Sequence, residues 1–112
     1  MSPELEILRG TLDVILLRAL TLGPLHGYGV SRWIRDRTHD ELTIEEGALY
    51  PALHRMEHRG WISAEWGVSE NNRRAKYYRL TPLGRRTLKA RTESWERLVN
   101  AVGKILYAPS RA

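Results

Sequence analysis

The stretch Thr43–Gly60, TIEEGALYPALHRMEHRG, decides the fold because it carries the expected ends and both faces of one helix. Thr43 and Glu46 have the spacing of a capping box, in which a hydroxyl and a carboxylate satisfy free backbone N–H groups at a helix N-terminus. Gly60 stands where a left-handed C-cap is expected. The sequence therefore predicts an amphipathic helix that begins at Thr43 and ends before Gly60.

The two faces of this helix differ in chemistry. One face carries apolar side chains at helical spacing and is expected to be buried: Leu49, Leu53 and Met56. The opposite face carries Gly47, Pro51, His54 and His58, flanked by Tyr50 and Arg55. Small residues allow close approach, and the aromatic and cationic groups can donate hydrogen bonds. A helix that enters the major groove of DNA needs such a face.

Pro51 conflicts with the predicted helix start. Inside a helix it lacks the N–H that would bond to the Gly47 carbonyl, and its ring crowds that carbonyl. The regular helix therefore either begins later than Thr43 or bends at Pro51. The sequence leaves both alternatives open.

The composition indicates one globular domain. The chain has 112 residues, of which 42% are hydrophobic and 28% are charged, enough for one modest core. It contains no Cys, which excludes disulfides and thiolate metal sites. No apolar run approaches the roughly 20 residues that span a bilayer, and the N-terminus lacks a signal-peptide pattern. We therefore expect a cytoplasmic protein with no membrane partner.

Positive charge is concentrated in one segment. The chain has a net charge of +5, and Ser69–Arg91 holds eight cations and one anion, so this segment carries +7 and the remainder −2. Such a block is expected to bind a polyanion. A solvated basic surface is the alternative interpretation.

Periodicity and turn residues predict the other elements. We expect a helix from Ser2 to about Leu22, a turn at 23–27, a second helix from about Tyr28 to Thr38, a β-hairpin over 61–80 with its tip at 71–74, and a last helix from Thr81 to Tyr107. The fold class is mainly α with a small β-hairpin (α+β). Residues 1–81 would form a winged helix-turn-helix and residues 82–112 a dimerisation helix, in one continuous unit.

The last helix carries an apolar stripe that is too long for a compact domain to cover. Its members are Leu88, Trp95, Leu98, Val99, Val102, Ile105 and Leu106. A symmetric homodimer through this stripe, assisted by Leu8, Leu12 and Ile15 of the first helix, is the simplest way to bury it.

Four segments together resemble the PadR family of transcriptional regulators, in its short subclass. These segments are GTLD at 10–13, GPLHGY at 23–28, EGALYPALHR at 46–55 and RRAKYYRLTPLG at 73–84. The resemblance implies a winged helix-turn-helix homodimer that represses transcription from a palindromic operator and often releases double-stranded DNA when a small molecule binds.

The resemblance also implies roles for individual residues. The positions facing the groove would be Gly47, Ala48, Tyr50, Pro51, His54 and Arg55. The wing positions would be Asn72, Arg73, Arg74 and Lys76, with Tyr28 supporting the helix pair near the DNA backbone. Some family members bind flat aromatic effectors between the subunits. Trp95 could stack on such an effector, although a place in the core of the interface is the more ordinary interpretation.

Enzymatic motifs give little support to catalysis. His54 to His58 matches the H-x-x-E-H pattern of zinc proteases, but the sequence offers no third ligand beside it. Phosphate-binding glycine loops and a nucleophile elbow are missing from the sequence. We expect no enzymatic activity, no metal and no cofactor. A winged-helix adaptor that binds protein, and non-specific binding of RNA or single strands, are the alternatives to regulation of transcription.

Overall fold

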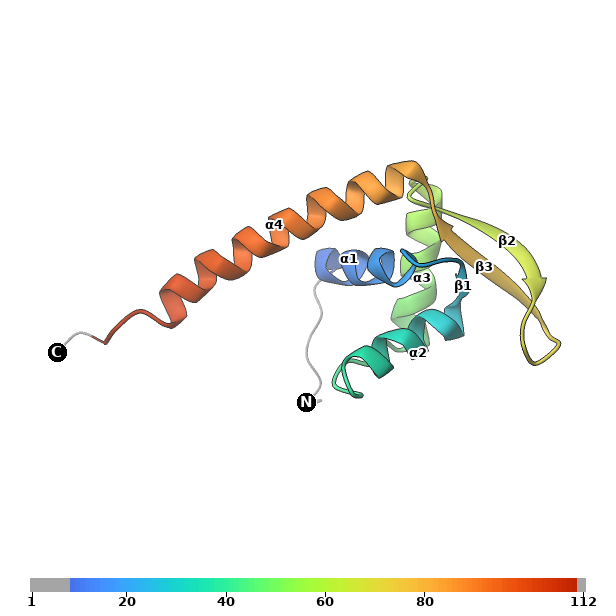
Figure 1. Ribbon diagram of the computed structural model, residues 1–112, viewed down its shortest axis with the longest axis horizontal. Helices are drawn as coiled ribbons and strands as arrows, with labels where there is room; N and C mark the ends of the chain where they lie inside the picture. Colours follow the sequence, from blue (N-terminus) through green and yellow to red (C-terminus); the bar gives the residue numbers. More distant parts are fainter. Residues whose placement is uncertain (1–8, 111–112) are drawn as a thin grey trace.

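The computed structural model describes residues 9–110, which form four helices and a three-stranded sheet. The elements in order are α1 (Arg9–Ala19), β1 (Leu25–His26), α2 (Gly27–Arg37), α3 (Glu46–His58), β2 (Ile62–Val68), β3 (Arg74–Leu80) and α4 (Pro82–Leu106). Figure 1 shows α1, α2 and α3 gathered beside the β2–β3 hairpin, while α4 extends far beyond them. The predicted α+β winged helix-turn-helix is confirmed. Within residues 9–110, no helix is long and apolar enough to cross a membrane.

α1 begins at Arg9, the first residue that the structure describes. The predicted cap at Ser2 and the predicted interface residue Leu8 lie outside the described residues. α1 ends at Ala19 rather than at Leu22, because a turn follows in which the Leu20 and Thr21 amides bond to the Leu17 and Arg18 carbonyls.

The predicted start of α3 is wrong. The helix begins at Glu46, and its N-cap is Glu45, which is extended and makes no side-chain capping bond. Ile44 explains the later start, because its side chain is buried in the core and an extended approach carries it there. Pro51 still lies well inside α3, with its ring exposed, so the later start does not remove the conflict.

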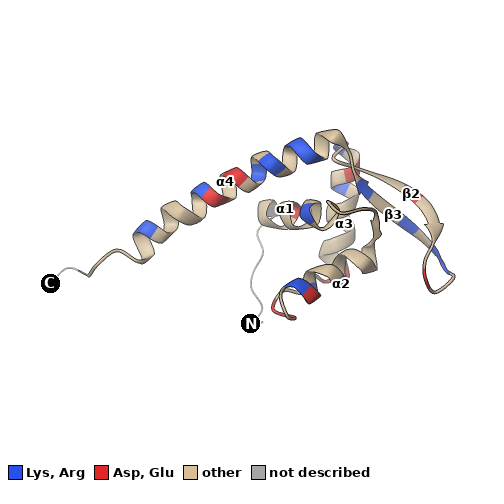
Figure 2. Cartoon of the chain, viewed as in Figure 1, with Lys and Arg blue, Asp and Glu red and all other residues tan. Residues whose placement is uncertain are grey.

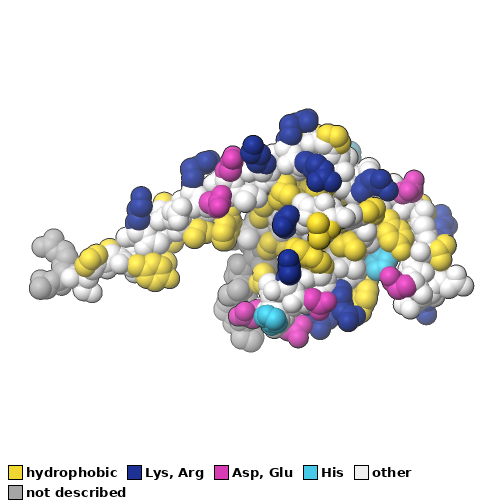
Figure 3. Space-filling model, viewed as in Figure 1, with side chains coloured by type: hydrophobic (Ala, Val, Ile, Leu, Met, Phe, Trp, Pro, Cys, Tyr) yellow, Lys and Arg dark blue, Asp and Glu magenta, His cyan; other side chains and the backbone are white. Residues whose placement is uncertain are grey.

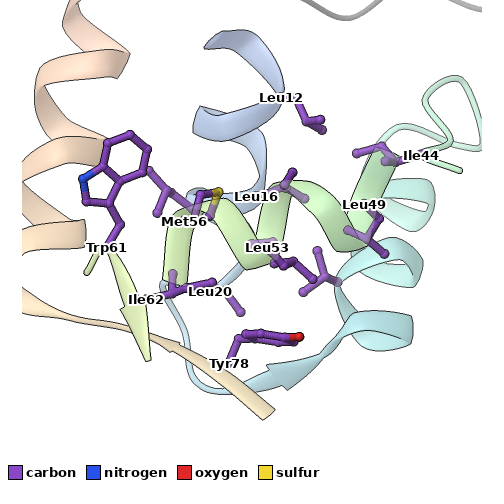
Figure 4. Close-up of a cluster of buried hydrophobic side chains, with 14 of the residues drawn as sticks. Leu12, Leu16, Leu20, Ile44, Leu49, Leu53, Met56, Trp61, Ile62 and Tyr78 are labelled. Atoms are coloured by element: carbon purple, nitrogen blue, oxygen red, sulfur yellow. The ribbon is translucent and has the colours of Figure 1, made fainter. Parts of the chain in front are cut away.

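The core forms where the three short helices meet the sheet (Figure 4). Leu49, Leu53 and Met56 of α3 are at most 1% exposed, which confirms the predicted inner face of this helix. α1 contributes Leu16 and Leu17, and the turn after it contributes Leu20, all at most 1% exposed. Leu12, predicted as an interface residue, belongs to this core instead, and so little of its side chain remains for a partner subunit.

The wing is the antiparallel hairpin of β2 and β3, paired from Ile62–Leu80 at its base to Val68–Arg74 at its tip. Ile62, Tyr78 and Leu80 are buried against the helices, as the sequence predicts. β1 adds a third strand by pairing with β3, in the order β1-β3-β2. This strand was predicted only as a turn, because its two residues are too short to show a period.

The beginning of α4 is fixed against the end of α3. Thr81 is the predicted N-cap: its hydroxyl accepts from the Gly84 amide at 3.0 Å and donates to the Gly60 carbonyl at 2.6 Å. Pro82 occupies the first turn, where its missing N–H costs nothing. Gly84 is buried so close to the chain that an added Cβ would lie 1.9 Å from the Trp61 carbonyl oxygen.

Gly84→Ala is expected to lower the free energy of unfolding by about 1–3 kcal/mol, because the methyl group must displace a backbone carbonyl. Gly47→Ala is the matched control, since Gly47 also lies in the first turn of a helix and an added Cβ there has nothing within 4 Å. That variant should be neutral or up to about 1 kcal/mol more stable. Urea denaturation measures both values. Equal stability of the two variants would contradict the close packing at Gly84.

Candidate nucleic-acid interface

A hollow of about 470 Å³ opens between the wing and the N-terminal ends of α2 and α3. Tyr28 of α2 and Tyr50 of α3 line it from the helices, and Arg73, Arg74 and Lys76 line it from the wing. The fold thus brings together five of the predicted DNA-contacting residues from three separate segments. Figure 2 shows that Lys and Arg positions follow β3 from the base of the wing towards its tip.

The outward face of α3 has the composition that the sequence predicts. Gly47, Ala48, Pro51 and His54 are all exposed. Tyr50 is 44% exposed, and its ring lies directly over Gly27, where an added Cβ would come within 2.6 Å of the ring. A glycine at this position therefore allows the Tyr50 ring to lie at the wall of the hollow.

Arg55 behaves differently from the other positions predicted to face the groove. Its guanidinium forms a short ion pair with Asp13 of α1, whose side chain is only 2% exposed. The guanidinium is thus turned into the protein rather than towards the outward face of α3. A signal for this contact was present in the sequence, because a carboxylate at position 13 lies within the apolar pattern of the first helix and needs a cation when buried.

Two of the three wing cations contact neighbouring side chains. The Arg74 guanidinium carbon lies 4.4 Å from the centroid of the Trp66 ring, and Trp66 is 57% exposed. Lys76 is less available, because its ammonium lies 3.1 Å from a carboxylate oxygen of Glu57 at the end of α3. Arg73 is exposed beside Asn72, which has a positive φ of 58° at the turn. A role for Trp66 was not predictable from the sequence, because stacking across two strands depends on their register.

His26 connects the N-terminus of α2 to the wing. Its Nδ1 accepts from the Gly29 amide at 2.9 Å and so caps α2, while its Nε2 lies 3.0 Å from a carboxylate oxygen of Glu70. Since Nδ1 accepts, Nε2 carries the proton and donates to Glu70. This hydrogen bond from His26 lowers the pKa of Glu70. Burial raises the pKa of Tyr78 at the base of the hollow, so its phenol stays neutral.

An apolar stripe on α4 lies away from this hollow. Trp95, Leu98, Val99 and Val102 are 40–59% exposed, and Ile105 and Leu106 are 76% and 68% exposed. Leu88 and Ile15 instead are partly buried against the core of their own chain. Figure 3 shows apolar side chains along one side of α4 and charged side chains along the other. The predicted interface residues beyond Leu88 therefore share an uncovered face.

Comparisons with known proteins agree with this arrangement. The profile of the family described as "Transcriptional regulator PadR-like family" matches residues 16–90. A transcriptional regulator from Clostridium thermocellum is 36% identical, with 90% of this chain and 96% of that chain covered and a TM-score of 0.80. A PadR family transcriptional regulator from Eggerthella lenta is 34% identical, with 90% and 86% covered and a TM-score of 0.77.

A curated relative from Lysinibacillus sphaericus, described as an uncharacterized protein, is 36% identical over 90 residues, which are 80% of this chain and 83% of that protein. Both the family profile and the two solved structures point to the same class of protein. The chain therefore belongs to the PadR-like family of transcriptional regulators, and it is a DNA-binding regulator of transcription.

Proposed function

We propose that this chain is a homodimeric repressor that binds a palindromic operator through α3 and the wing of each protomer. The observation that carries this proposal is the hollow in which Tyr50 of α3 and the wing cations Arg73 and Arg74 line one concave surface. A cationic concave surface beside an exposed helix suits a DNA backbone that passes between two adjacent grooves.

The residues of α3 have distinct roles in this proposal. Gly47, Ala48 and Pro51 allow the helix to approach the base edges closely, because they present little side chain on the exposed face. Tyr50 and His54 supply hydrogen-bonding groups for base edges or the neighbouring phosphates. Their exposure and their common helix face support these roles.

The remaining interface residues contact the DNA backbone. Arg73 and Arg74 contact phosphates or the adjacent minor groove. Lys76, which lies opposite Trp66 two residue pairs from the tip of the wing, lies beside the same DNA backbone. Asn72 forms the turn next to Arg73. Tyr28, at the start of α2, lies beside the DNA backbone. All of these except Asn72 line the hollow.

Dimerisation occurs through α4 in this proposal. This helix has 25 residues, and at about 1.5 Å per residue it is about 37 Å long. A second copy of α4 would cover the stripe that begins at Trp95, and two-fold symmetry would present two α3 helices to an inverted repeat. Trp95 lies at the near end of the stripe, where a small aromatic effector could stack between the subunits and release the DNA.

Arg73→Ala combined with Arg74→Ala should weaken binding to every duplex sequence, because both side chains contribute charge rather than base recognition. The slope of log affinity against log salt should become less steep by about two for each bound protomer. Fluorescence anisotropy with a labelled duplex at several salt concentrations measures this slope.

The matched control for the wing is Arg97→Ala combined with Lys104→Ala. It removes the same charge from two exposed positions on α4, far from the hollow. The control should leave the slope unchanged. If both double variants change the slope equally, the effect comes from net charge in general. That result would contradict a specific role of the wing in DNA binding.

The wild-type protein should sediment at twice the 12.9 kDa mass of one chain at micromolar concentration. Leu98→Glu combined with Val102→Glu should produce monomers, because it places two carboxylates in the apolar stripe. Asn100→Glu combined with Ala101→Glu adds the same charge at neighbouring exposed positions off the stripe and should remain dimeric. A monomeric wild-type protein would contradict the proposed dimer.

A further inference from the structure

Asp13 is the one charged side chain that is buried among the described residues, with 2% of its surface exposed. It lies on α1, next to the core residue Leu12. Removal of a carboxylate from water is unfavourable unless cations and hydrogen bonds compensate for the lost hydration. The partners of Asp13 therefore have to be fixed in position around it.

The two partners come from two different helices. Arg55 of α3 pairs with Oδ1 of Asp13, and Nη1 of Arg91 on α4 lies 4.0 Å from Oδ2. The Arg91 guanidinium carbon also lies 5.0 Å from the centroid of the ring of Trp61, which lies between α3 and β2. The Asp13 carboxylate thus connects α3, which is proposed to contact the base edges of DNA, with α4, which is proposed to form the dimer interface.

The place of α1 in the fold makes this connection important. α1 packs against both α3 and α4, which are separate from one another in the sequence (Figure 1). Arg91 lies one helical turn before Trp95, on the same side of α4 as the apolar stripe. A change in the orientation of α4 at Arg91 would therefore change the orientation of the whole proposed dimer interface relative to α3.

We propose that Asp13 is a positioning residue that sets the half-site spacing accepted by the dimer. By pairing with Arg55 and Arg91, it fixes the angle between α3 and α4, and two-fold symmetry converts that angle into the separation of the two α3 helices. This inference rests on the proposed dimeric, operator-binding function.

Apolar packing alone does not define this angle as sharply. Burial of apolar surface is non-directional, so leucine contacts between helices tolerate small rotations. The charge-assisted hydrogen bond from Arg55 to Asp13 has a required geometry and fixes the carboxylate relative to α3. The longer ion pair with Arg91, at 4.0 Å, attracts α4 towards that fixed carboxylate.

The test uses a panel of duplexes that carry the same two inverted half-sites, with the spacer changed one base pair at a time. The wild-type dimer should bind one spacing best. Arg91→Met should reduce the affinity ratio between the best spacing and its neighbours by about two- to tenfold. This variant keeps the Asp13–Arg55 pair and the long side-chain stem, so the chain should fold and dimerise; circular dichroism and sedimentation check both.

Asp13→Asn weakens the pairs with both Arg55 and Arg91, so it should reduce the spacing preference at least as much as Arg91→Met does. Adding Arg91→Met to Asp13→Asn should cause no further loss of spacing preference, because the link from Asp13 to α4 is already broken. Lys89→Met is the matched control, since Lys89 is an exposed cation on the same helix, and it should leave the spacing preference unchanged.

Equal loss of affinity at every spacing in Arg91→Met would overturn the inference, because a phosphate contact or a general loss of stability has that effect. An unchanged ratio in Arg91→Met would overturn it as well. If the wild-type protein prefers no inverted repeat at all, the proposed function fails, and this inference fails with it.

Discussion

The burial of α1 is the constraint on which the rest of the structure depends. Leu16 and Leu17 of α1, and Leu20 directly after it, are almost completely buried. Successive side chains of a helix point about 100° apart, so Leu16 and Leu17 need more than one neighbour to cover them, and α2, α3 and α4 all pack on α1. This arrangement uses the inner face of α3 and only the first half of α4. It leaves the outer face of α3, the wing and the distal stripe of α4 available for other molecules.

The cations of the chain divide into two groups by their surroundings. Arg73 and Arg74 are exposed at the wing, where they add to the positive potential of the hollow. Arg55, Arg91 and Lys76 instead pair with carboxylates of their own chain. The number of cations therefore overstates the charge presented to a polyanion, and the position of each cation decides whether it attracts a partner or stabilises the fold.

Long and strongly periodic segments were predictable from the sequence. The inner face of α3, the hairpin and α4 each repeat one pattern over several residues, so local errors do not change their assignment. The capping pattern at Thr43 failed because it was a local rule, and the burial of Ile44 outweighed it. β1 was missed because it exists only through its pairing with β3.

The candidate site was predictable in outline but not in its internal contacts. Tyr50 and the wing cations were identified from their residue types, and the fold places them together. The Asp13–Arg55 and His26–Glu70 contacts join residues that are 42 and 44 positions apart, so no local pattern identifies the partners. The apolar pattern around Asp13 indicates only that this carboxylate needs a cation. Arg55 lies at the border of two helix faces, and only the position of α1 decides to which side it turns.

The central claim is that two copies of this chain together recognise a specific duplex sequence. The most direct measurement is selection of bound duplexes from a random library at near-physiological salt, where attraction to phosphates alone is suppressed. A dimer that recognises an operator should enrich an inverted repeat, and this result would show sequence specificity and two-fold symmetry at once. Recovery of no common sequence by a folded dimer would contradict the account and favour an adaptor that binds protein.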